Sequence, residues 1–389
     1  MKDYPPLPDG LPRILSASSA LASWPDSVCR VLDAPELKEL APAPDGWIAG
    51  RLRRLPLCNE DNEPRRIRDL SAGYAEQGFE LRALGARLLL ADGVTTVAEA
   101  RAAVLGGRQT GLPVMVCVEL DDEGETPEGV PFASILASVQ HLGASAVGFR
   151  CSGDRIDTLS ILGQHAAFAQ VPLMPVLRSR GRQPEEIQVH AMQALRAGGD
   201  LFLLGNAIDD AQLAAAEQAL AEFRPTDRVI KRDEETLFMA CEAEVFYLQP
   251  DDLSFCEPIP CQYDMGADIL EAESQGCDVL TVYVDSPEDA ENFAENAHRI
   301  RLPVCICSHH EVALEMALME YNGRAFVDLQ SELSDLELYT LAKADTLPLF
   351  QMAAPKPGKT PTLSWALIRN TIMKMYGESK PGRYRTITI

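Results

Sequence analysis

Short apolar runs alternate with longer segments of helical period along most of the chain. The runs are rich in valine, isoleucine and leucine, as at 88–91, 113–120, 146–151, 171–177 and 201–204. Each is followed by a stretch in which apolar positions recur every three or four residues. Continuous apolar strands that alternate with helices predict a parallel sheet buried on both faces. We therefore expect an α/β fold whose right-handed βα units form a barrel or an open sheet.

The alternation pauses once and then resumes. Residues 223–232 are polar and include Pro225, which indicates a domain boundary. We expect a first domain at 1–225 and a second βα domain at 226–389. In the second domain we predict strands at 279–284, 304–307, 325–329 and 347–351, and a closing helix at 363–376. The first 60 residues are less regular, with strands expected at 13–16 and 47–50 and a short helix at 36–40.

The net charge of the chain and the length of its apolar runs limit the partners that it can bind. The chain has 389 residues and a net charge of −23, so its surface repels polyanions and nucleic acid is a poor partner. No apolar run reaches about 18 residues, and the polar N-terminus lacks the pattern of a signal peptide. These features predict a cytoplasmic protein without a membrane span, whose ten cysteines are reduced.

One segment departs from the acidic balance. After residue 355 seven basic residues face a single acid, Glu378. The basic residues are Lys356, Lys359, Arg369, Lys374, Lys380, Arg383 and Arg385. The segment is either a solvated helix and tail or a surface that docks onto an acidic protein partner.

Four sequence blocks carry a resemblance to a known family. They are Leu88–Val104, Leu112–Gly124, Leu142–Ser152 and Val171–Val176. In this order and spacing they resemble the fourth to seventh strands of the homocysteine S-methyltransferase family, over about residues 68–223. The resemblance implies a βα barrel of eight strands. It also implies a zinc ion that acidifies the thiol of homocysteine, so that the thiolate attacks an activated methyl group.

The family motif for zinc is only partly present. The family uses one cysteine after the sixth strand and a Cys-Cys pair after the eighth. Cys151 aligns with the first ligand, whereas Gly205 and Asn206 stand in place of the pair. One thiolate with an amide is a poor zinc site, because soft anionic ligands supply most of the affinity. The residue before the first cysteine, usually asparagine in the family, is Arg150.

Two functional hypotheses follow from the resemblance. In the first, the chain transfers a methyl group to a thiol, converting homocysteine to methionine, with a folate or corrinoid donor that the sequence does not identify. The substrate-binding residues would then be Asp92, which would contact the substrate amine, Cys151 and Asn206. In the second, the chain is a catalytically silent binding or scaffold relative in a methionine synthase or corrinoid methyltransferase system.

The second domain offers weaker candidates. Parts of it, such as 279–285 and 302–308, resemble pterin-binding methyltransferase barrels, whose polar contacts would fall on Asp285, Cys307 and Asp328. A βα scaffold without a pterin is the alternative. Cys305 and Cys307 alternate onto one strand face, with His309 just beyond, and sulfur with imidazole suits zinc or copper. Core thiols beside a polar loop explain the same three residues.

Overall fold

The computed structural model describes residues 10–17, 25–40, 46–152, 157–205, 208–233, 235–250 and 253–327. The chain divides into two compact units, of which the first contains 4–132 and 143–233. The second contains 133–142 and the residues from 234 onward. Asn206, Asp328, the expected strand at 347–351, the expected helix at 363–376 and the basic tail lie outside the described residues.

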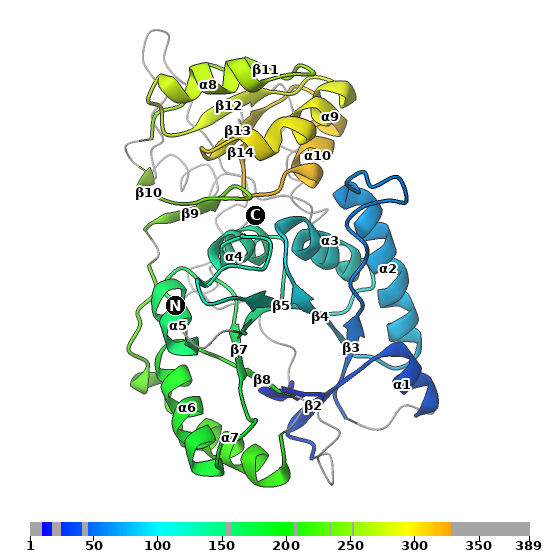
Figure 1. Ribbon diagram of the computed structural model, residues 1–389, viewed down its shortest axis with the longest axis vertical. Helices are drawn as coiled ribbons and strands as arrows, with labels where there is room; N and C mark the ends of the chain where they lie inside the picture. Colours follow the sequence, from blue (N-terminus) through cyan, green and yellow to red (C-terminus); the bar gives the residue numbers. More distant parts are fainter. Residues whose placement is uncertain are drawn as a thin grey trace, which may run out of the picture. The chain divides into compact units, whose positions relative to one another are not determined.

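The first unit contains a closed barrel of eight parallel strands, seen nearly end-on in Figure 1. The strands are β1 (Ile14–Ser16), β2 (Val28–Leu32), β3 (Ile48–Leu52), β4 (Leu88–Val94), β5 (Val114–Leu120), β6 (Ala146–Cys151), β7 (Leu173–Leu177) and β8 (Phe202–Leu204). Each strand pairs with the next, and β8 pairs with β1 to close the ring. The predicted α/β barrel is therefore confirmed, and three of its strands come from the first 52 residues.

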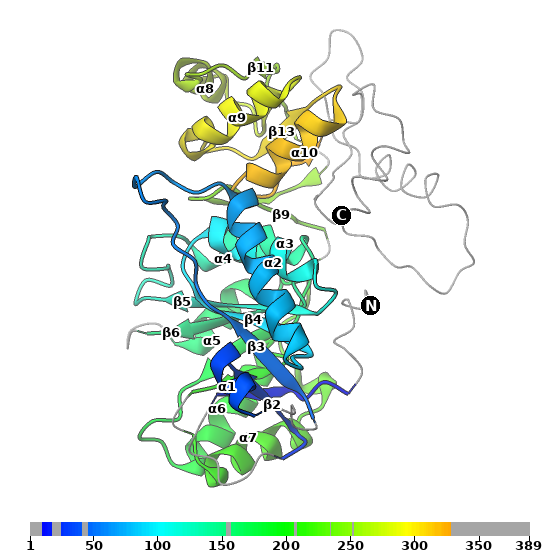
Figure 2. The same cartoon turned by 90° about the vertical axis from the view of Figure 1, so that its right-hand side faces the viewer.

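Helices separate the strands in the order expected for βα units. They are α1 (Ala34–Glu39), α2 (Ile67–Ala83), α3 (Val97–Arg108), α4 (Phe132–Gln140), α5 (Thr158–His165), α6 (Pro184–Arg196) and α7 (Asp210–Glu222). Local hydrogen bonds fix several helix starts. The Thr96 hydroxyl accepts from the Glu99 amide, and the Asp209 carboxylate accepts from the Gln212 amide. Figure 2 shows α2 running along the outside of the barrel beside β3.

The pleat of the strands sorts side chains into two sets. One apolar cluster gathers residues of a single parity from all eight strands, including Leu90, Cys117 and Met174, and it fills the barrel interior. Residues of the other parity face the helices. Leu89 lies against α2 and α3, and the Phe149 ring contacts the Phe132 ring at 5.1 Å between centroids. A one-residue step along a strand therefore moves a side chain from the lumen to the helical layer.

The second unit holds a smaller βα array. Four parallel strands pair in chain order: β11 (Ile259–Pro260), β12 (Leu280–Tyr283), β13 (Val304–Cys307) and β14 (Phe326–Val327). The helices α8 (Gly266–Ser274), α9 (Pro287–Asn296) and α10 (Glu311–Glu320) connect them, and β9 (Leu237–Ala240) and β10 (Val245–Leu248) form an antiparallel pair. The predicted second βα array is confirmed. No helix of the described residues is long and apolar enough to cross a bilayer.

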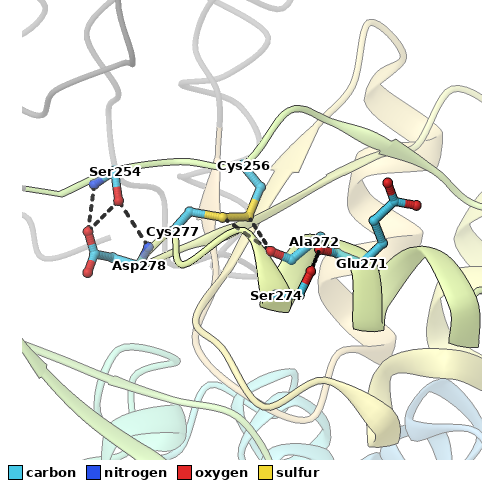
Figure 3. The surroundings of a disulfide bond; sticks show 7 residues. All are labelled: Ser254, Cys256, Glu271, Ala272, Ser274, Cys277 and Asp278. Atoms are coloured by element: carbon cyan, nitrogen blue, oxygen red, sulfur yellow. Dashed lines mark hydrogen bonds between the residues drawn. A yellow bond between two sulfur atoms is a disulfide. The ribbon is translucent and has the colours of Figure 1, made fainter.

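A disulfide joins Cys256 to Cys277 in this unit (Figure 3), so the prediction that all cysteines are reduced is wrong for this pair. The cause is strand pairing. Phe255 and Val279 form a parallel bridge, and Ser254 donates its amide and hydroxyl to the Asp278 carboxylate. These contacts hold the two Cα atoms 5.6 Å apart, which is the usual separation for a disulfide.

The close approach of α3 to α2 at Gly106 predicts a large stability effect. A Cβ at Gly106 would overlap the Ser71 carbonyl oxygen and approach the Ala75 amide nitrogen to 2.9 Å. We expect Gly106→Ala to lower the free energy of unfolding by about 1–3 kcal/mol, because α2 and α3 must separate. Denaturant titration followed by circular dichroism measures the change.

Gly163→Ala is the matched control, because no atom lies within 4 Å of the Cβ it would add to α5. It should raise the free energy of unfolding by about 0.5–1 kcal/mol, since alanine loses less entropy in a helix. Equal effects of the two substitutions would contradict this account of the helix contact.

Candidate functional site

Charged side chains gather on the lumen side at the carboxyl ends of β2 to β6, the end where sites of βα barrels form. Each lies two positions beyond an inward-facing residue of its own strand, so the pleat directs it inward. We call this set the mouth cluster: Asp33, Arg51, Asp92, Glu119 and Arg150. Sequence reasoning selected Asp92 and noted Arg150 as a departure, and it missed the other three.

Asp92 lies between two guanidinium groups. Arg150 Nη2 is 3.0 Å from Asp92 Oδ1, and Arg51 Nε is 3.9 Å from Asp92 Oδ2. Arg51 Nη1 also reaches Asp33 Oδ1 at 3.6 Å. Burial is the largest single influence and would lower the pKa of Arg150, but the negative charges of Asp92, Cys117 and Glu119 and the hydrogen bond to Asp92 together outweigh it, and the pKa is raised. The Arg150 guanidinium therefore stays protonated at every physiological pH.

A bulge in β4 sets the position of Asp92. The register with β5 shifts between Asp92 and Val94, and the extra residue is Gly93 with φ 79°. This left-handed conformation is readily available to glycine. Beyond the bulge, Val94 pairs with Val118, whose parity faces the helices. Asp92 is thus the last residue of β4 that points into the lumen.

Cys151 does not join the mouth cluster. It follows Arg150 by one residue and faces the helical layer, with 6% of its surface exposed. Burial raises the pKa of its thiol to about 11, and the nearby Arg178 guanidinium opposes this only in part. Cys151 and Asp92, which sequence reasoning placed in one substrate site, therefore lie on opposite faces of the barrel wall.

Cys151 instead lines a cavity of about 610 Å³, which we call the side pocket. Its walls come from the ends of β6 and β7, the start of α5 and one face of α6. The polar groups that line it include Asp157, Thr158, Arg178, Arg182 and His190. An Arg178 amino group donates to the Cys151 carbonyl oxygen, which joins the ends of the two strands.

The second candidate cluster, Cys305, Cys307 and His309, lies in β13 and the loop after it. Cys305 is fully buried in an apolar cluster with Phe255 and Phe326. The His309 ring packs edge-on against Tyr283, with 5.6 Å between centroids. In the part of the chain that the structure describes, no three His, Cys, Asp or Glu side chains are arranged to hold a metal ion.

Residues 33–221 match the family model of homocysteine S-methyltransferase, a range that contains α1 to α6, nearly all of α7 and six of the eight barrel strands, β3 to β8. Over these residues the barrel is similar to the homocysteine S-methyltransferase family. No curated protein matches the chain.

Several solved structures also resemble the chain. The apo form of the homocysteine methyltransferase MmuM from Escherichia coli is 18% identical, with 49% of this chain and 79% of that chain covered and a TM-score of 0.37. Its metallated form is 16% identical, with 49% and 78% covered and a TM-score of 0.38. Triosephosphate isomerase from Bartonella henselae is 12% identical, with 54% and 98% covered and a TM-score of 0.34. Similarities at these TM-scores give no information about the chain beyond the barrel fold described above.

The described residues around Cys151 do not fit the zinc that homocysteine S-methyltransferases imply. Such a site needs three protein ligands and one open position. Gly205, which follows β8, has no side chain that could bind a metal ion. A Cβ added at Gly205 would point toward Ser179 and lie 3.5 Å from its hydroxyl oxygen. The charged neighbours that influence Cys151 are Arg178 and Asp157, one of them a cation. We therefore route no chemical step through zinc.

The state of the Cys151 thiol gives a direct test. With its pKa raised to about 11, Cys151 is almost wholly protonated at pH 7. Alkylation by iodoacetamide should be slow at pH 7 and should accelerate about tenfold per pH unit up to pH 10, because only the thiolate reacts. Mass spectrometry of tryptic peptides measures the rate.

Exposed Cys58 in the same sample reports the reactivity of an accessible thiol. The outcome that contradicts the assignment is Cys151 alkylation at pH 7 that is as fast as that of Cys58.

Proposed function

We propose that this chain is a binding member of the homocysteine S-methyltransferase family, which holds a small polar molecule at the mouth cluster and does not methylate thiols through zinc. The observation that carries this proposal is the Arg150–Asp92 ion pair at 3.0 Å. A silent role of this kind suits the scaffold position in a methionine synthase or corrinoid methyltransferase system that the family resemblance implies.

The pair bears on how a substrate amine could bind. The family resemblance assigns to Asp92 the contact with the amino group of homocysteine. Here the chain's own guanidinium groups already hold that carboxylate, from β3 and β6. An ammonium ion would have to displace Arg150, whose side chain is one-third exposed (34%), and leave that charge without its partner. Unpaired, partly buried charge is costly, so amine recognition at Asp92 is disfavoured.

The thiol half of the reaction is equally unsupported. Cys151 faces away from Asp92, so one homocysteine could not place its amine at the carboxylate and its sulfur at that thiol. Without a metal to lower its pKa, a substrate thiol near pH 7 remains mostly protonated and is a weak nucleophile. Methyl transfer from a folate or corrinoid donor to homocysteine is the alternative function, and it rests on the family resemblance alone.

The mouth cluster is suited to a ligand that both donates and accepts hydrogen bonds. The cluster contains three carboxylates and two guanidinium groups. Beside them, the Ser152 hydroxyl donates a hydrogen bond to Glu119 Oε1 at 2.8 Å. Glu119 has no cation within 4 Å among the described residues, and the Arg51–Asp33 contact is long. Glu119, Arg51 and Asp33 can therefore exchange partners with a small polar molecule while the Arg150–Asp92 pair stays in place.

The first experiment measures zinc and methyl transfer in the purified chain. We expect well under one zinc per chain, whereas a working site of this type holds about one. We also expect no methionine from homocysteine with methyltetrahydrofolate or methylcobalamin as donor. One zinc per chain together with methionine formation would overturn the proposal in favour of the alternative function.

The second experiment restores the family residue with Arg150→Asn. Removing this guanidinium leaves Asp92 with only the longer 3.9 Å contact to Arg51. Calorimetric titration with homocysteine should therefore show an affinity at least tenfold higher than that of the unmodified chain, a change of about 1.4 kcal/mol. Arg53→Asn is the control, because Arg53 is exposed just beyond β3 and outside the mouth cluster. If both variants bind homocysteine no better than the unmodified chain, the ion pair is not what excludes the amine.

A further inference from the structure

The side pocket lies on the other side of the barrel wall from the mouth cluster, and its lining has a distinct chemistry. Arg182 Nη1, from the loop before α6, lies 2.7 Å from Nδ1 of His190 on α6. No carboxylate of the described residues forms an ion pair with the half-buried Arg182 side chain. Among the described residues, the imidazole is therefore the close polar partner of Arg182, and no carboxylate oxygen lies within 4.0 Å of its guanidinium group.

This contact fixes the state of His190. Burial lowers the pKa of His190, and the charges of Arg182 and Arg178 lower it further, against an opposing effect of Asp157. The imidazole is therefore neutral at pH 7. Because a guanidinium can only donate, Nδ1 must accept and the ring proton must sit on Nε2. His190 thus contributes a second hydrogen-bond donor beside Arg182.

Two of the acidic residues that line the side pocket accept hydrogen bonds from backbone amides at helix starts. Asp157 Oδ1 accepts from the Ser160 amide at 2.7 Å, and Glu186 Oε2 accepts from the Gln183 amide at 2.7 Å. These hydrogen bonds cap the first turns of α5 and α6. Glu185, the third acidic residue, is exposed at the rim of the pocket. On the inner side Arg178 lies close enough to lower the pKa of the Cys151 thiol, so a second guanidinium contributes positive potential to the wall.

We propose that the side pocket binds a small organic anion, a carboxylate or a phosphate monoester, with Arg182 as its principal anchor and His190 as a hydrogen-bond donor. The volume of about 610 Å³ is within the range of small-molecule sites. Leu159 and Val189 give the pocket an apolar wall that would contact a short carbon chain. The site is separate from the mouth cluster, so it stands or falls independently of the function proposed above.

Calorimetric titration at low ionic strength tests the proposal with two probes, butyrate and inorganic phosphate. We expect at least one of them to bind the full chain, and Arg182→Gln to weaken that binding at least tenfold. Tighter binding of butyrate would identify the ligand as a carboxylate, and tighter binding of phosphate as a phosphate monoester. Arg180→Gln is the matched control, because Arg180 is exposed in the same loop and does not line the pocket.

A second variant covers the case in which Arg182→Gln does not fold. Val189 is 58% exposed at the rim of the pocket, so Val189→Glu should leave the fold intact and repel an anion. We expect it too to weaken binding at least tenfold. Failure of both probes to bind the unmodified chain at 10 mM, or equal binding by the unmodified chain and the variants that fold, would overturn the proposal.

Discussion

The pleat of a closed parallel barrel is the constraint on which the site depends. In a ring of eight strands, consecutive side chains must point alternately into the lumen and toward the helices. Arg150 and Cys151 are neighbours in β6, and this rule sends the guanidinium to Asp92 and the thiol to the side pocket. The barrel thus carries two polar environments of different chemistry, separated by the thickness of one strand.

Most of the architecture could be predicted from hydrophobic periodicity. The apolar runs of β4 to β8 and β12 to β14 stand out because they are buried on both faces, as parallel strands are. The strand β2 was missed because Arg30 interrupts its short apolar run. Periodicity could not show that Arg150 meets Asp92, because the two residues are 58 positions apart and a bulge at Gly93 sets the register.

Sequence comparison gave the ancestry of the barrel but not the geometry of its candidate site. Alignment to the family motif treats Cys151 as one member of a ligand set, whereas the structure surrounds it with Arg178, Asp157 and Thr158. The side pocket depends on the loop between β7 and α6, from which Arg182 contacts His190, eight residues further along the chain. The only signal for it in the sequence was the density of arginine and histidine at 178–190, which is equally common on solvated surfaces.

The bond between Cys256 and Cys277 gives the two units different sensitivities to their surroundings. It closes a segment of 21 residues that includes β11 and α8, so this part of the chain keeps a tether even when unfolded. A loop of that length restricts the unfolded ensemble by about 3 kcal/mol at room temperature. The barrel's described cysteines are all free thiols, so a reductant would loosen the smaller array and leave the barrel unaffected.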